Sequence, residues 1–106
     1  MSTPFIVVLT TFSKKADARR ISRLLTRKKL AACVNILNAV ESFFWWEGKV
    51  ERVKENLVLI KTKSSQFSAL RKFLEKNHPY SVPEIIALPV QKGNAPYLNW
   101  LQASLR

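Results

Sequence analysis

Short apolar runs alternate along the chain with stretches whose apolar residues recur at helical spacing. Residues 5–11, FIVVLTT, are almost all apolar or β-branched, which is typical of a buried strand. Residues 14–29 place apolar side chains on one helical face and basic side chains on the other. The apolar face consists of Ala18, Ile21, Leu24 and Leu25. The pattern predicts a strand and then an amphipathic helix capped by Ser13.

The second half of the chain repeats this alternation. Residues 64–76 predict a helix with a cap at Ser64 or Ser65, and Pro79 ends it because proline cannot continue a helix. The apolar stripe of this helix is Phe67, Leu70, Phe73 and Leu74. Residues 84–90 predict a strand at a sheet edge or bulge, since Pro89 stands near its end. A last helix starts near Pro96, which suits a first helical turn, and its apolar face holds Leu98, Leu101 and Leu105.

The central residues 30–63 predict a long β-hairpin. Glu47-Gly48 is the only turn signal inside this stretch, and glycine supplies the positive φ that a tight hairpin turn needs. Each arm has room for about 14 residues, or roughly 45 Å at the rise of a strand. A compact domain of this length has a radius of gyration near 13 Å, roughly. An unbroken hairpin would therefore project beyond its own domain, unless a bulge bends it.

The tip of this hairpin carries four consecutive aromatic residues, 43–46. Neighbouring strand residues point to opposite faces, so the four rings make both faces apolar. Fully buried, they would contribute on the order of 15 kcal/mol as an upper bound. One small domain covers one face of such a ribbon, and we infer that another subunit covers the rest. The alternative is a bent hairpin whose rings fold back onto the same chain.

The element order is β-α-β-β-α-β followed by a C-terminal helix, which is the split βαβ, ferredoxin-like pattern of an α+β fold. One antiparallel sheet with a long central hairpin is then covered by two helices on one face. We expect residues 1–106 to form a single domain. The other face of the sheet is also apolar in this pattern, which again indicates oligomerisation.

Composition adds constraints on location and partners. With 106 residues and 47% hydrophobic residues, the chain has room for one core, and no apolar run approaches the length of a membrane span. The first residues lack the basic region of a signal peptide, and one cysteine excludes an internal disulfide framework, so we expect a cytoplasmic protein. The formal net charge of +11 raises nucleic acid or an anionic ligand as a partner. The basic residues are dispersed along the chain without a nucleic-acid motif, so surface solubility is our preferred explanation and nucleic acid is an unlikely partner.

Five segments, in this order, resemble the CutA divalent-cation-tolerance proteins. They are LAACVNI (30–36), WEGKVE (46–51), LIKTK (59–63), HPYSVPEIIALPV (78–90) and YLNWL (97–101). The resemblance covers nearly the whole chain. It implies a ferredoxin-like subunit in a tight cytoplasmic homotrimer, similar in fold and assembly to the PII signalling proteins. It also implies an association with tolerance to copper and other divalent cations, and with copper binding.

The ligands that copper prefers are scarce in this chain. Imidazole and thiolate occur once each, in His78 and Cys33. The resemblance implies a copper site built from a cysteine at the end of the first strand and a His-His pair before Pro-Tyr. In this chain those positions hold Thr10, Asn77 and His78. Only His78 carries over as a metal ligand, and its alternative role is to end a helix beside Pro79. Cys33 is expected to be a small core residue.

No set of residues indicates catalysis, and we predict that the chain is not an enzyme. The acid–base candidates are Glu47, Glu51, Glu84 and His78, without a suggestive Ser/His/Asp spacing. By analogy with PII-like trimers, an alternative function is the sensing of a small anionic ligand in a cleft between subunits. Trp46, Lys61 and Tyr80 are the candidate lining residues. A further alternative is a basic nucleic-acid-binding module.

Overall fold

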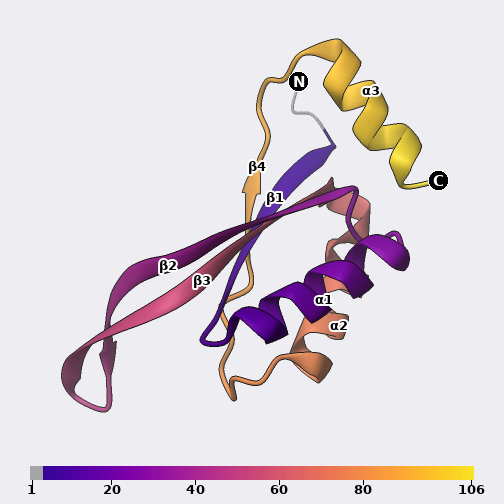
Figure 1. The fold of residues 1–106 in the computed structure, drawn as a ribbon. Coiled ribbons are helices and arrows are strands. Elements are labelled where there is room, and N and C mark those ends of the chain that lie inside the picture. Colours follow the sequence, from indigo (N-terminus) through magenta and orange to yellow (C-terminus); the bar gives the residue numbers. More distant parts are fainter. Residues whose placement is uncertain (1–3) are drawn as a thin grey trace.

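The computed structural model describes residues 4–106 as four strands and three helices (Figure 1). Residues 1–3, which contribute to the expectation that no signal peptide is present, lie outside the described part of the chain. The elements in chain order are β1 (Phe5–Phe12), α1 (Lys15–Arg27), β2 (Cys33–Trp46), β3 (Lys49–Lys63), α2 (Phe67–Asn77), β4 (Ile86–Pro89) and α3 (Ala95–Ser104). None of the helices within residues 4–106 has both the length and the apolar character that crossing a membrane requires.

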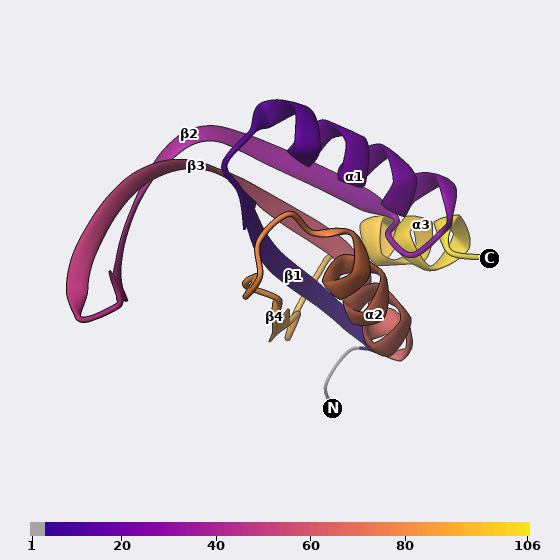
Figure 2. The ribbon, with the colours of Figure 1, turned by 90° about the horizontal axis from the view of Figure 1, so that it is seen from below.

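The four strands form one antiparallel sheet in the order β2-β3-β1-β4. Helices α1 and α2 lie on the same face of it, whereas α3 lies at one end (Figures 1 and 2). This arrangement confirms the predicted α+β, ferredoxin-like fold with an added C-terminal helix.

The core lies between the sheet and helices α1 and α2. Alternate residues of β1 point into it, and Val8 and Phe12 have no exposed surface. From the helices, Ile21 and Leu25 of α1 and Leu70 of α2 are equally buried. The helical periodicity of the sequence therefore identified the buried faces of both helices.

Strands β2 and β3 form the predicted hairpin, and its turn is at Glu47-Gly48. Both turn residues have positive φ, 49° and 78°, which is the two-residue turn that matches the twist of a hairpin. The pairing is interrupted between Leu37 and Val40, where β2 carries an extra residue. Ala39 adopts a φ of 58° in this bulge. The hairpin accordingly curves instead of running straight (Figure 2).

The face of the sheet opposite α1 and α2 is apolar, as the sequence indicates. We call it the open face. Val7 and Leu9 of β1 lie on it, because their neighbours in the strand point into the core. Ile86 and Leu88 of β4 pair with them and remain 52% and 51% exposed. Helix α3 contacts β3, and its Leu101 is buried.

Several element boundaries differ from those predicted. Ser13 does not cap α1, since Lys14 occupies the cap position without a side-chain hydrogen bond. Residues Ser64–Gln66 form a turn of 3₁₀ helix, so α2 starts at Phe67 and neither Ser64 nor Ser65 caps it. Strand β4 spans only Ile86–Pro89, and these four residues pair with residues 6–9 of β1.

Candidate functional site

A cavity of about 750 Å³ lies between the curved hairpin and the segment that joins α2 to β4. We call it the hairpin groove. The hairpin contributes Ser42, Phe43, Phe44, Trp46, Glu51, Val53 and Glu55. The joining segment contributes Tyr80, Ser81, Val82 and Glu84, and β1 contributes Thr11. Its volume falls within the range of small-molecule sites.

Strand alternation explains all the hairpin residues that line the groove except Phe43, which has the parity of Trp45. Phe44 pairs with Glu51 and Ser42 with Val53, so these side chains share one face of the hairpin. Trp45 points to the other face and is 74% exposed. The four consecutive rings therefore do divide between two faces, as expected, and all four are exposed in the single chain.

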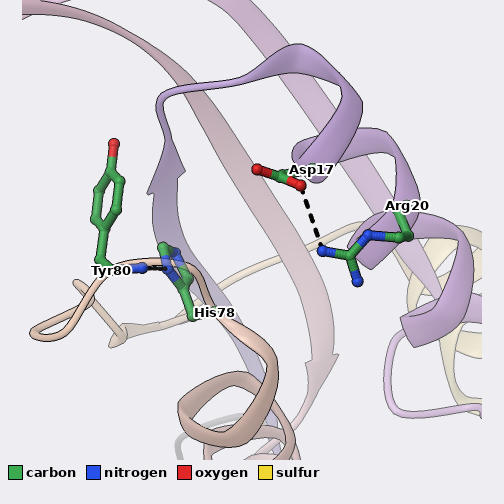
Figure 3. A network of polar contacts seen from close by, with 4 residues as sticks. All are labelled: Asp17, Arg20, His78 and Tyr80. Atoms are coloured by element: carbon green, nitrogen blue, oxygen red, sulfur yellow. Dashed lines mark hydrogen bonds and ion pairs between the residues drawn. The ribbon is translucent and has the colours of Figure 1, made fainter.

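Behind the lining residues Thr11 and Tyr80, His78 is a neutral imidazole that contacts both of them through its ring nitrogens. Its Nε2 lies 2.9 Å from the carbonyl oxygen of Thr11. A carbonyl oxygen only accepts, so Nε2 carries the proton. The amide N–H of Tyr80 donates to Nδ1 at 3.1 Å, as Figure 3 shows. The ring also stacks on Phe12, with 4.3 Å between centroids.

Burial lowers the pKa of His78, because the charged imidazolium would lose its contact with water. The hydrogen bond to Thr11 and the negative charges of Asp17 and Glu55 oppose this effect and are weaker. Asp17 lies at the start of α1 and pairs with Arg20 at 3.3 Å (Figure 3). His78 therefore holds loop and strand together as an uncharged residue.

Beside His78, Tyr80 and Glu55 form a second buried contact. The phenol of Tyr80 donates a hydrogen bond to Oε2 of Glu55 at 2.7 Å. Burial is the largest of the effects that together raise the pKa of Tyr80 to about 12, and Glu55 contributes through this bond and its charge. Glu55 is only 7% exposed and forms no ion pair among residues 4–106. A buried carboxylate of this kind attracts a cation.

The charged residues that line the groove are all acidic, namely Glu51, Glu55 and Glu84. Burial raises the pKa of Glu84, and the negative charge of Glu55 raises it further. The groove thus has a charge opposite to the net +11 of the chain. Its aromatic and acidic lining suits a cationic ligand better than an anionic one.

The structure brings together two of the three predicted lining residues. Trp46 and Tyr80 both line the groove. Lys61 does not, because it lies six residues farther along β3 than Glu55, with its Nζ 5.7 Å from the ring centroid of Tyr97 in α3. Glu55 was not predicted as a lining residue, although the alternation of Glu51, Val53 and Glu55 behind the turn was a usable signal.

The candidate metal ligands do not form a copper site within one chain. Both nitrogens of His78 are occupied, and the amide of Asn77 donates to the Phe73 carbonyl at 2.8 Å. Thr10 is fully buried, and its hydroxyl has no partner within the described chain. Across residues 4–106, no three His, Cys, Asp or Glu side chains come together as a ligand set.

Cys33 is not the core residue that we expected. It pairs with Lys61 on the open face of β2, which is an edge strand, and its side chain is partly exposed. Its neighbour Val34 packs against the core, so the side chain of Cys33 points to the opposite face of the strand. The nearest polar contact of its thiol is Oδ1 of Asn35 at 3.8 Å.

Comparison with known proteins agrees with the fold and with the five sequence segments. Residues 6–104 match the family model for the CutA1 divalent ion tolerance protein. A chloroplastic CutA 1 protein from rice is 47% identical over 105 residues, which cover 99% of this chain but only 59% of the rice protein.

Two crystal structures extend the comparison to three dimensions. The structure of CutA1 from rice has a TM-score of 0.93 at 47% identity, covering 99% of this chain and 96% of that one. A protein from Archaeoglobus fulgidus, described as a periplasmic divalent cation tolerance protein, has a TM-score of 0.92 at 37% identity and covers 96% and 99%. The chain therefore belongs to the CutA1 divalent ion tolerance family.

Proposed function

We propose that this chain is a non-catalytic divalent-cation tolerance protein that works as a cytoplasmic homotrimer and binds copper or another divalent cation. The observation that carries the proposal is the family match over residues 6–104, which leaves almost no part of the described chain unmatched. The hairpin groove fits this role, since its charged side chains are carboxylates that attract cations.

Assembly is supported by the apolar surface of the single chain. Phe43, Trp45 and Val50 of the hairpin are more than half exposed, as are Ile86 and Leu88 of the open face. Covering the exposed parts of the four rings at 43–46 would stabilise an assembly by on the order of 10 kcal/mol. That figure is comparable to the cost of associating subunits, which is about 4–15 kcal/mol. Sedimentation should therefore give a trimer at micromolar concentration, and a monomer would refute this part of the proposal.

Copper binding at His78 stays a prediction, and it has a structural cost. A metal at Nδ1 would displace the amide of Tyr80, and one at Nε2 would displace the carbonyl of Thr11. Further ligands would come from other subunits, because one chain offers no set of three.

Calorimetric titration of Cu(II) tests His78 directly. We expect the His78→Gln variant to bind more weakly than the unmodified protein, and Cys33→Ser to serve as the control for the only thiol. Identical curves for all three proteins would remove His78 as a ligand. Circular dichroism of each variant shows whether the buried ring was needed for folding.

A second candidate function is the sensing of a small ligand in the hairpin groove. The groove volume of about 750 Å³ and the position of Trp46 and Tyr80 favour it. The anionic ligand expected by analogy with PII proteins would need basic residues from a neighbouring subunit, because the groove of one chain has only acidic ones. A thermal-shift screen of amines, divalent cations, nucleotides and carboxylates distinguishes these classes, and no shift in any class would contradict the sensing role.

A further inference from the structure

The fold concentrates the positive charge of the chain on one side. We define the helical layer as residues 14–29 and 67–77, which comprise α1, α2 and their flanks. It holds eleven of the eighteen basic residues and two of the seven acidic ones, and so accounts for nine of the eleven net charges. The fold thus brings most of the basic residues onto one surface. Surface solubility was preferred because these residues are dispersed along the sequence, and that reason does not apply to the folded chain.

The strongest row of charge runs along α1. Lys15, Arg19, Arg23 and Arg27 follow one another at intervals of four residues, and all are exposed. They span about 18 Å at the rise of an α-helix. The buried residues Ala18, Ile21 and Leu25 lie on the opposite side of the helix. We call these four residues the α1 ridge, which lies on the solvent-exposed side of the helix.

The stability of the helix does not explain the ridge. Like charges four residues apart destabilise a helix, and Lys14 and Lys15 oppose the helix dipole at its N-terminus. The helical layer contains two ion pairs, Arg20–Asp17 at 3.3 Å and Arg71–Glu75 at 2.6 Å. Within residues 4–106, no member of the α1 ridge forms an ion pair. The row is therefore a set of exposed, unpaired cations that is available to an external anionic partner.

The composition of the layer indicates what that partner is. None of the large exposed hydrophobic side chains belongs to residues 14–29 or 67–77. The layer therefore has no apolar group to insert into a membrane and no exposed ring on which a single-stranded base could stack. Arginine predominates in the ridge, and its guanidinium matches the oxygens of a phosphate.

We propose that the helical layer binds the phosphate backbone of double-stranded nucleic acid without reading its base sequence. The layer lies on the face of the sheet opposite the open face (Figure 2). Assembly through the hairpin and the open face leaves it accessible, and each added subunit adds a further ridge. The proposal does not depend on the metal or ligand chemistry of the groove, and it holds for a single chain as well.

Salt dependence of binding to a labelled 20-base-pair DNA duplex, followed by fluorescence anisotropy, tests this proposal. Four phosphate contacts predict that log K falls against log[NaCl] with a slope of about −4 for each bound subunit. Replacing Arg19, Arg23 and Arg27 together by Gln should reduce the slope to about −1. Glutamine has nearly the helix propensity of arginine, so the helix is retained. Replacing the same three residues by Lys should preserve most of the slope.

A matched control removes three charges elsewhere. Lys49, Lys61 and Lys92 lie outside the helical layer, Lys61 on the open face, and their joint replacement by Gln should leave the slope unchanged. An equal loss in the control would show that only net charge matters and would overturn the proposal. So would the absence of binding at 25 mM NaCl, or binding to phosphatidylserine vesicles without binding to the duplex. Sedimentation of the same samples keeps a failure of assembly separate from a failure of DNA binding.

Discussion

The helical layer and the hairpin expose different kinds of side chain to water. On the helical layer, Ile21, Leu25 and Leu70 turn inward without exposed surface, and charged residues cover the outside. On the hairpin, the rings at 43–46 are all exposed in the single chain, and β4 and α3 add Leu88 and Trp100. The helices of the chain therefore cover one face of the sheet over part of its length, whereas the open face and both faces of the hairpin tip are uncovered; we call these uncovered parts the unfinished side.

The contrast teaches how the two sides can be used. An apolar surface is stable only when covered, so the hairpin side is suited to permanent contact between subunits. A highly charged surface without exposed apolar groups is stable in water and suits reversible, salt-sensitive contact with a polyanion. The hairpin groove lies on the unfinished side, where covering subunits would change its shape and its charge.

The largest effect is expected when charge is placed on the hairpin tip. Phe43 and Trp45 are 65% and 74% exposed in the single chain, and covering the rest of both rings contributes on the order of 7 kcal/mol per subunit. The double variant Phe43→Glu, Trp45→Glu should therefore sediment as a monomer at micromolar concentration. The control Ala16→Glu, Ala69→Glu adds two carboxylates to exposed positions of the helical layer and should leave the assembly intact. Dissociation in the control but not in the hairpin variant would reverse our assignment of the two sides.

A pair of leucine truncations compares the two sides directly. Leu25 has no exposed surface, and Leu25→Ala should lower the free energy of unfolding by about 3 kcal/mol. Leu88 is 51% exposed in the single chain, so Leu88→Ala should cost about 1 kcal/mol in the monomer. Urea denaturation at two protein concentrations measures both. The cost at Leu88 should rise with concentration if subunits cover the open face, whereas equal costs at every concentration would show that no such difference exists.

Local patterns in the sequence predicted most of the fold. The apolar period of residues 14–29 identified the buried face of α1, and Gly48 located the hairpin turn, because only a few residue types accept its positive φ. The bulge at Ala39 carried no such signal. Alanine normally avoids a positive φ, and the surrounding pairing of β2 with β3 imposes it there.

The candidate site was less predictable, because it depends on that bulge. Trp46 and Tyr80 share the groove only because the hairpin curves toward the segment after α2. Strand alternation places Glu55 on the face of Glu51 and Val53, but it does not reveal the contact with Tyr80, which is 25 residues away in the chain. The gathering of charge on the helical layer was missed for the same reason, since it requires α1 and α2 to lie on one face.

A pH-dependent effect is expected where the helical layer meets the groove. The folded-state pKa of His78 is below the ordinary value of 6.5, so the unfolded chain binds more protons near that pH. The contribution of neutral His78 to the free energy of unfolding is therefore fully present well above pH 6.5. It is lost as the pH falls through the folded-state pKa, by at most about 1.4 kcal/mol per pH unit for one group. The raised pKa of Glu84 acts in the opposite direction, because its folded form binds a proton more readily above pH 4.5.

Denaturation between pH 7.5 and 5.5 measures this dependence. The variant His78→Gln should show a flatter profile than the unmodified protein, because its buried side chain does not titrate. Tyr80→Phe keeps the imidazole and the amide that contacts it, and should keep the slope. Parallel profiles for the unmodified protein and His78→Gln would mean that groups other than His78 control the pH response.

The smallest effect concerns the turn that holds the unfinished side in shape. Glu47 adopts a φ of 49°, which asparagine tolerates better than glutamate, and Asn-Gly is the preferred pair for this turn. Glu47→Asn should raise the free energy of unfolding by about 0.5 kcal/mol. Gly48→Ala should lower it by about 1 kcal/mol, although a Cβ there meets no other atom within 4 Å, because the φ of 78° strains any other residue. Changes of opposite sign in the free energy of unfolding at these two adjacent positions indicate an effect of backbone conformation. Thermal denaturation of both variants measures the two changes. If both variants lost stability equally, lost side-chain contacts at the tip would explain the result, and the turn would not set the curvature of the groove.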